Sequence, residues 1–85
     1  MKREIKELVK AMESIKGDGA KISIVHKLYG DQKLRCEFVP IVTEKIGFNI
    51  KGQEIYINRD EINKVCLTDS ICFADDVMEI NIKTE

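Results

Sequence analysis

The sequence predicts an α+β domain in which one N-terminal amphipathic helix packs on an antiparallel meander of five or six strands. The hydrophobic period changes at Gly17-Asp18-Gly19-Ala20: apolar residues recur every three or four positions before this hinge and every second position after it. The 85 residues form a single domain, 1–85, with a helix over residues 2–16 and strands over residues 20–83. A meander of short strands exposes its edges, and closure into a small barrel would hide them.

The helical segment carries one apolar stripe. Its members are Ile5, Leu8, Val9, Met12 and Ile15. Charged residues of both signs occupy the opposite face, so we expect the helix to cover the sheet rather than to lie on a membrane surface. Gly17 or Gly19 is expected to end the helix in the left-handed conformation, with Lys16 near the negative end of the helix dipole.

Residues 21–29 and 33–39 predict a first hairpin around Gly30-Asp31-Gln32. Alternation places apolar residues on its inner face and polar residues, such as Lys21, Ser23, Lys33 and Arg35, on its outer face. The expected inner residues are Ile22, Ile24, His26, Leu28, Leu34, Cys36 and Phe38. Val25 and Val39 interrupt the polar face, and we interpret them as contacts with the helix or with another subunit.

The second hairpin has the clearest signal. Residues 46–50 and 53–57 alternate on either side of Lys51-Gly52, where glycine suits the positive φ of a two-residue turn. Before this hairpin, Pro40 is expected to break the preceding strand, and residues 41–44 to form a bend.

The last third is expected to contain one capped turn and one strand pair. Asn58 and Glu61 have the spacing of a capping box, which directs Ile62 and Val65 inward. Residues 71–73 and 78–82 predict two short strands joined by Ala74-Asp75-Asp76.

Charge is balanced overall and unevenly distributed. Residues 1–17 carry five basic and three acidic side chains, a net charge of +2, whereas residues 59–85 carry three and seven, a net charge of −4. This balance disfavours broad, salt-driven binding of nucleic acid, and the acidic end could meet a basic partner. No apolar run approaches the roughly 20 residues that cross a bilayer, so we expect a cytoplasmic protein without a membrane partner.

No cluster in the sequence predicts catalysis, a metal or a cofactor. The three cysteines, an odd number, favour reduced thiols. A zinc site built from Cys36, Cys66, Cys72 and His26 would lack the close ligand pair of zinc modules. Asp69, Asp75 and Asp76 are explained by turn formation, because aspartate side chains bond to nearby backbone amides. We therefore expect a protein that is not an enzyme.

The order of these elements resembles the Sm-like family, and most closely its bacterial RNA-chaperone branch. The resemblance extends over about residues 3–67, and its most specific part is KGQEIYINRDEI, residues 51–62. Small barrels of the SH3 type share much of this pattern. It implies a five-stranded barrel that assembles into a ring and binds single-stranded RNA near the loops after its second and fourth strands. Asn58-Arg59-Asp60 stands where the family has a basic, histidine-containing step, and residues 70–83 exceed the expected barrel.

The sequence thus favours a small non-catalytic module that acts through contacts with another protein or through self-association. The alternative is an Sm-like oligomeric RNA-binding protein, in which Tyr56 and Arg59 could stack on a base and contact a phosphate. The candidate interaction surface consists of Val25, Val39, Tyr56, Arg59, Asp75 and Asp76. An Ile-, Lys- and Asn-rich composition suggests a low-GC bacterium or its mobile elements.

Overall fold

The N-terminal helix ends earlier than the sequence predicts. The computed structural model describes residues 1–15 and 19–83, and helix α1 spans Lys2–Ser14. Ile15 has already left the helix, with an extended backbone at φ −80° and ψ 144°. Gly19 has φ +69°, several residues beyond the last helical one, so it does not end the helix as expected. Lys16 and Gly17, the other residues expected at this end, lie outside the described residues.

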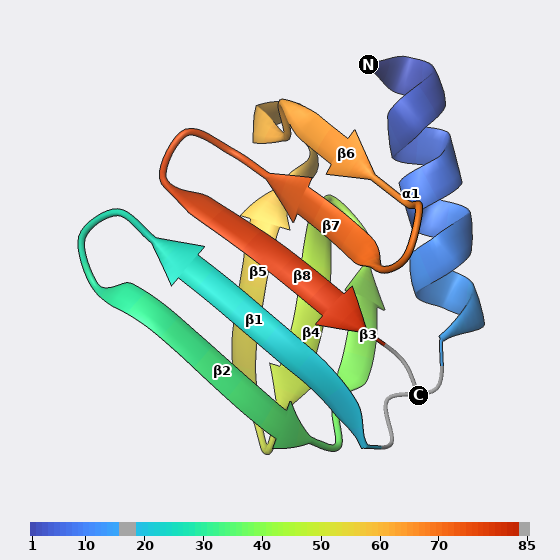
Figure 1. Ribbon diagram of the computed structural model, residues 1–85. Coiled ribbons are helices and arrows are strands. Elements are labelled where there is room, and N and C mark those ends of the chain that lie inside the picture. The colour runs from blue at the N-terminus through green and yellow to red at the C-terminus, as the bar shows by residue number, and fades with distance from the viewer. Residues whose placement is uncertain (16–18, 84–85) are drawn as a thin grey trace.

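Eight strands and one short 3₁₀ helix follow α1 in the described part of the chain. They are β1 (Ala20–His26), β2 (Gly30–Cys36), β3 (Val39–Val42), β4 (Lys45–Ile50), β5 (Gln53–Asn58), η1 (Arg59–Glu61), β6 (Lys64–Cys66), β7 (Ile71–Ala74) and β8 (Met78–Lys83). The strands form two antiparallel sheets, one in the order β2-β1-β8-β7-β6 and one in the order β3-β4-β5 (Figure 1). This arrangement confirms the α+β class with an N-terminal helix on antiparallel strands. Over residues 19–83 the strands make two sheets and no closed barrel.

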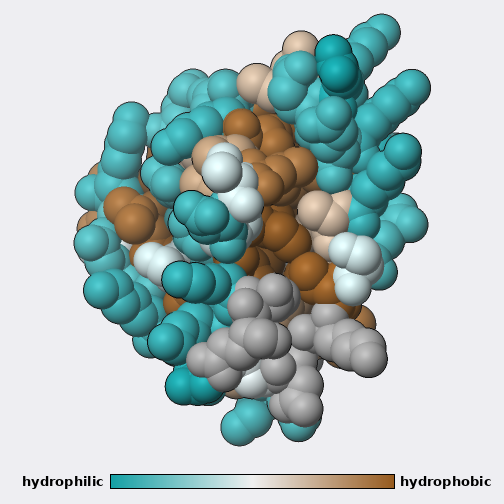
Figure 2. All heavy atoms as spheres, turned by 45° about the vertical axis from the view of Figure 1, so that its right-hand side comes forward, coloured by the Kyte–Doolittle hydropathy of each residue, from teal (hydrophilic) through white to brown (hydrophobic). Residues whose placement is uncertain are grey.

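The core lies between the two sheets, and α1 covers one side of it. The helix contacts β3 of the smaller sheet and β6 and β7 of the larger one (Figure 1). Leu8 and Met12 are fully buried there, as the apolar stripe predicted. The sheets contribute Ile22, Ile24, Ile46, Phe48, Ile57, Ile71, Phe73, Ile80 and Ile82. Seen from the side that carries the helix, an apolar strip reaches the surface between hydrophilic residues (Figure 2).

The first hairpin turns three residues earlier than expected. His26 pairs with Gly30, so the loop is Lys27-Leu28-Tyr29 and not Gly30-Asp31-Gln32. Gly30 has φ +77°, which suits the residue that closes a three-residue hairpin loop. Leu28, expected on the inner face, is therefore in the loop and 79% exposed.

The two strands of this hairpin differ in burial. Ile22 and Ile24 of β1 are buried, as expected. Leu34 of β2 is 36% exposed, although the alternation predicted an inward position. The reason is that β2 forms the edge of the larger sheet, where one neighbouring strand is missing.

The second hairpin is confirmed, and an additional strand lies beside it. Strands β4 and β5 pair around Lys51 and Gly52, whose φ values of 51° and 89° suit a two-residue turn of the type I′ class. Pro40 pairs with Phe48 within β3, so it does not break the strand as expected. The reason is that β3 is an edge strand, where the missing proline N–H need not face another strand.

The last third contains the predicted turn and strand pair, together with the unexpected strand β6. Asn58 precedes η1 as expected, but its side chain makes no capping hydrogen bond. Ile62 is buried and Val65 is part-buried against the core. Strands β7 and β8 pair as predicted, and β6 adds a further edge to the larger sheet. No helix in the described residues is long and apolar enough to span a membrane.

Candidate interaction surfaces

The structure separates the two valines of the predicted surface. Val25 is 44% exposed near the end of β1 in the larger sheet. Val39 is 66% exposed at the start of β3 in the smaller sheet. Both are accessible, and because they belong to different sheets they do not form one patch.

Tyr56 and Arg59 are held by neighbouring residues. The Lys45 Nζ atom lies 4.6 Å from the centroid of the Tyr56 ring, and the same ammonium pairs with Glu54 at 3.6 Å. A cation therefore already occupies one side of the ring. The Arg59 amide donates to the Glu44 carbonyl at 2.9 Å, and its Nε is buried without a hydrogen-bond partner.

Asp75 and Asp76 hold the β7–β8 turn. One oxygen of Asp75 accepts hydrogen bonds from the amides of Val77, at 2.9 Å, and Met78, at 2.7 Å. Asp76 accepts a hydrogen bond of 2.7 Å from the Asn63 side chain. Turn formation, the alternative interpretation of such residues, accounts for Asp75, whereas Asp76 bonds to a side chain outside the turn.

The structure shows an exposed apolar tip that the sequence analysis missed. Its members, which we call the hairpin tip, are Leu28, Tyr29 and Val77. Tyr29 is 82% exposed, and the β1–β2 and β7–β8 turns lie side by side (Figure 1). The Lys27 amide donates to the Val77 carbonyl at 3.0 Å and joins the two turns.

Local contacts fix the shape of the hairpin tip. Nδ1 of His26 accepts a hydrogen bond of 3.0 Å from the Leu28 amide. The His26 and Tyr29 rings lie 4.6 Å apart between centroids. His26 thus stands at the rim of the core, one of the positions expected for a lone histidine. The loop is ordered before any partner arrives, which lowers the entropic cost of binding.

A second feature is a row of cations on the outer face of the larger sheet. In the described part of the chain, no other element covers this face (Figure 1). The basic row consists of Lys21, Lys33, Arg35 and Lys83. Lys21 is the direct cross-strand partner of both Arg35 and Lys83. These residues, with Ser23 and Asn81, line a shallow hollow of about 500 Å³.

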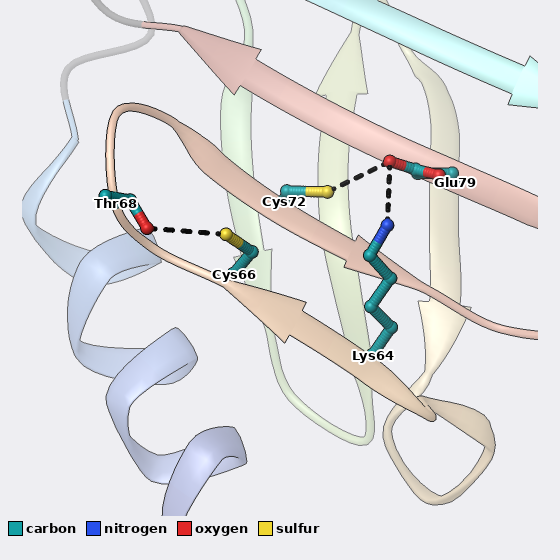
Figure 3. Close-up of polar contacts among 5 residues, drawn as sticks. All are labelled: Lys64, Cys66, Thr68, Cys72 and Glu79. Carbon is teal, nitrogen blue, oxygen red and sulfur yellow. Dashed lines mark hydrogen bonds and ion pairs between the residues drawn. The ribbon is translucent and has the colours of Figure 1, made fainter.

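The third feature is a pair of cysteines on neighbouring strands. Cys66 of β6 lies directly opposite Cys72 of β7 in the register of the pair. Cys66 is exposed, and its sulfur lies 3.5 Å from the Thr68 hydroxyl; Cys72 is buried, and its thiol donates to Glu79 at 3.2 Å (Figure 3). Lys64 pairs with the same Glu79 oxygen at 3.5 Å. Over residues 1–15 and 19–83, no group of three or more His, Cys, Asp or Glu side chains is placed to hold a metal ion.

Comparisons with models of known protein families, with curated proteins and with solved structures find no match. The resemblance to Sm-like proteins therefore stays a prediction. The surfaces of the chain itself indicate what it can bind. The hairpin tip and the basic row are the most distinctive of these surfaces.

Signals for both surfaces were present in the sequence but incomplete. A glycine directly after three loop residues often closes a hairpin loop. Assigning Gly30 to this position would have predicted Leu28 and Tyr29 in the loop and not in the strand. Alternation did place Lys21, Lys33 and Arg35 on one outer face. Lys83 joins them only because β8 pairs with β1, a contact between distant parts of the chain that local patterns do not encode.

Proposed function

We propose that this protein is a small non-catalytic interaction module that binds a partner protein through the hairpin tip. The observation that carries the proposal is the exposure of Leu28 and Tyr29, 79% and 82%, beside the exposed Val77. Burial of apolar surface contributes about 25 cal/mol per Å², and tyrosine is enriched among residues that dominate binding energies. The partner is expected to offer an apolar pocket that receives these side chains.

A cross-linking experiment from two positions of the chain identifies the partner that contacts the tip. A photoreactive residue is introduced at Lys27, in the tip, and in a second variant at Lys10, an exposed position on α1. A protein that cross-links from position 27 and not from position 10 is then purified for binding measurements. A second copy of this chain is one outcome, and it would make the module self-associating.

The affinity of the purified pair tests the proposal. The variant Leu28→Ser/Tyr29→Ser should bind at least about tenfold more weakly, because each truncated central contact costs roughly 1 kcal/mol or more. Val39→Ser, which removes an equally accessible side chain from the other sheet, is the matched control and should bind like the unchanged protein. Equal affinities of the tip variant and the unchanged protein would refute binding through the tip.

The basic row favours a second candidate function, the binding of a single-stranded RNA. The row places four cations on one face of the sheet, where they can contact successive phosphates of a single strand. Charges on the edge strand β2 also deter pairing with other chains, which accounts for Lys33 and Arg35. Edge protection does not account for Lys21 on the central strand β1 or for Lys83 on β8.

The salt dependence of RNA binding tests this candidate. Four phosphate contacts predict that the logarithm of the affinity for a short single strand falls with a slope of about −2.8 against the logarithm of salt concentration. Lys33→Gln/Lys83→Gln should make that slope shallower by about 1.4, because two contacts are lost. Lys6→Gln/Lys10→Gln on α1 is the control for net charge. Equal slopes in the two double variants would contradict a site at the basic row.

A further inference from the structure

The backbone already places Cys66 and Cys72 at disulfide distance. They are Cα partners in the antiparallel β6–β7 pair. Direct partners in such a pair have Cα atoms about 4.5–5.5 Å apart, and a disulfide needs about 4.4–6.8 Å. Direct partners also project from the same face of a sheet, so the register of this pair is compatible with a bond between the two sulfurs.

In the reduced protein each sulfur has another partner. Cys66 lies beside the hydroxyl of Thr68, and Cys72 beside the carboxylate of Glu79 (Figure 3). The two sulfurs point away from each other, toward these partners (Figure 3). Rotation of the two side chains would bring them together, and β6 is a three-residue edge strand that imposes few packing constraints on Cys66.

The two thiols differ in reactivity. Hydrogen bonds from the side chain and the backbone of Thr68 lower the pKa of Cys66, with a further contribution from Lys64 and an opposing one from Asp69. Burial raises the pKa of Cys72 to about 11, and the hydrogen bond to Glu79 adds to the effect. The thiolate is the nucleophile, so the exposed Cys66 reacts with an oxidant first.

We infer that Cys66 and Cys72 form a redox-reactive site, in which Cys66 is oxidised by a hydroperoxide and Cys72 then closes a cross-strand disulfide. The inference does not depend on the proposed function, because neither thiol belongs to the hairpin tip or to the basic row.

The reaction has two balanced steps. The Cys66 thiolate attacks one peroxide oxygen: the S–O bond forms, the O–O bond breaks, and the leaving oxygen takes a proton, so the sulfur is oxidised by two electrons and the peroxide reduced by two. Cys72 then attacks the sulfur of this sulfenic acid: the S–S bond forms, the S–O bond breaks and water leaves. Glu79, 3.2 Å from the Cys72 sulfur, is placed to accept the thiol proton, and the departing hydroxide takes up one proton to leave as water, so the step balances. A dithiol reductant restores both thiols by exchange.

Mass spectrometry of the folded full-length chain tests the site. The reduced protein is treated with hydrogen peroxide, alkylated and cleaved on the N-terminal side of aspartate, which separates the cysteines because Asp69 lies between them. The expected product is a linked peptide pair containing Cys66 and Cys72, reversed by dithiothreitol, with Cys36 alkylated. Cys36→Ala should give the same product, and Cys66→Ser should give none. A linkage that includes Cys36, or a Cys66 oxidised while Cys72 is still alkylated, would overturn the inference.

Rates of alkylation test the assigned roles without relying on a variant of the buried Cys72. At neutral pH Cys66 should react at least about tenfold faster than Cys72, because each pKa unit changes the thiolate fraction about tenfold. As pH rises, the midpoint of the rate increase at Cys66 should lie below the pKa of an ordinary thiol, and the rate at Cys72 should still rise near pH 11. Thr68→Val should move the Cys66 midpoint to higher pH. Equal rates at the two cysteines would refute the order of reaction.

Discussion

Gly47 shows how one missing side chain determines local packing. It faces Tyr56 across the β4–β5 pair. A Cβ atom on Gly47 would overlap the carbonyl oxygen of Ile55 and would lie 2.6 Å from the Tyr56 Cα. The absence of a side chain thus allows β5 to approach β4 closely. Lys45 lies over the Tyr56 ring and pairs with Glu54, so this part of the smaller sheet depends on glycine at one position.

Gly47→Ala should therefore destabilise the protein by about 1–3 kcal/mol, because the added methyl group meets backbone that cannot move without disturbing the sheet. Urea unfolding followed by circular dichroism measures the change. Gln32→Ala, on the exposed edge strand β2, is the control and should stay within about 0.5 kcal/mol. A Gly47 variant as stable as the control would mean that β5 can shift away from β4 at little cost.

At the scale of the element, local patterns predicted what local residues determine. Helix α1, the β4–β5 hairpin and the β7–β8 pair follow from periodicity and turn residues, and all are present. The predicted β1–β2 turn was misplaced because Gly30 was assigned to the loop. In the structure Gly30 is the first residue of β2 and pairs with His26. Strand β3 was missed because proline was expected to break a strand. Proline is acceptable in an edge strand, and β3 is an edge strand because it pairs only with β4.

The candidate surfaces were less predictable because distant elements form them. The hairpin tip depends on the contact between the Lys27 amide and the Val77 carbonyl, from two different hairpins. The basic row depends on the pairing of β1 with β8. Of the six residues predicted for an interaction surface, none belongs to the hairpin tip, although Asp75 holds the adjacent turn and Asp76 ties that turn to Asn63.

The position of α1 over one side of the core, in contact with both sheets, makes it a structural element of the core. Leu8→Ala should lower the free energy of unfolding by about 2–5 kcal/mol, because a fully buried side chain is removed and the two sheets cannot both close on the cavity. Lys10→Ala, on the exposed face of the same helix, should change it by less than about 0.5 kcal/mol. Thermal unfolding of both variants measures these changes. If α1 served only to bind a partner, Leu8→Ala and Lys10→Ala would change the free energy of unfolding by similar amounts.

In the whole molecule, the three surfaces occupy different regions of the larger sheet. The hairpin tip lies at the ends of two hairpins, the basic row crosses β2, β1 and β8, and the cysteine pair lies at the β6 edge. Leu28 and Tyr29 of the tip, the four cations of the row and Cys66 are exposed, whereas Cys72 is buried. One chain could therefore bind a protein at the tip without covering the basic row or the cysteines.

The mass of the purified protein in solution distinguishes self-association through the tip from the RNA-binding ring that the Sm-like resemblance implies. A chain of 9.7 kDa with a net charge of −1 and a basic row of four cations should elute free of nucleic acid at moderate salt, as a monomer or a dimer. If a dimer forms through the tip, Leu28→Ser/Tyr29→Ser should convert it to a monomer, and Val39→Ser should not. Size-exclusion chromatography with light scattering, together with the ratio of absorbance at two ultraviolet wavelengths, measures both properties. A ring-sized oligomer that carries RNA would instead favour the Sm-like alternative, because ring assembly and RNA binding are what that resemblance implies.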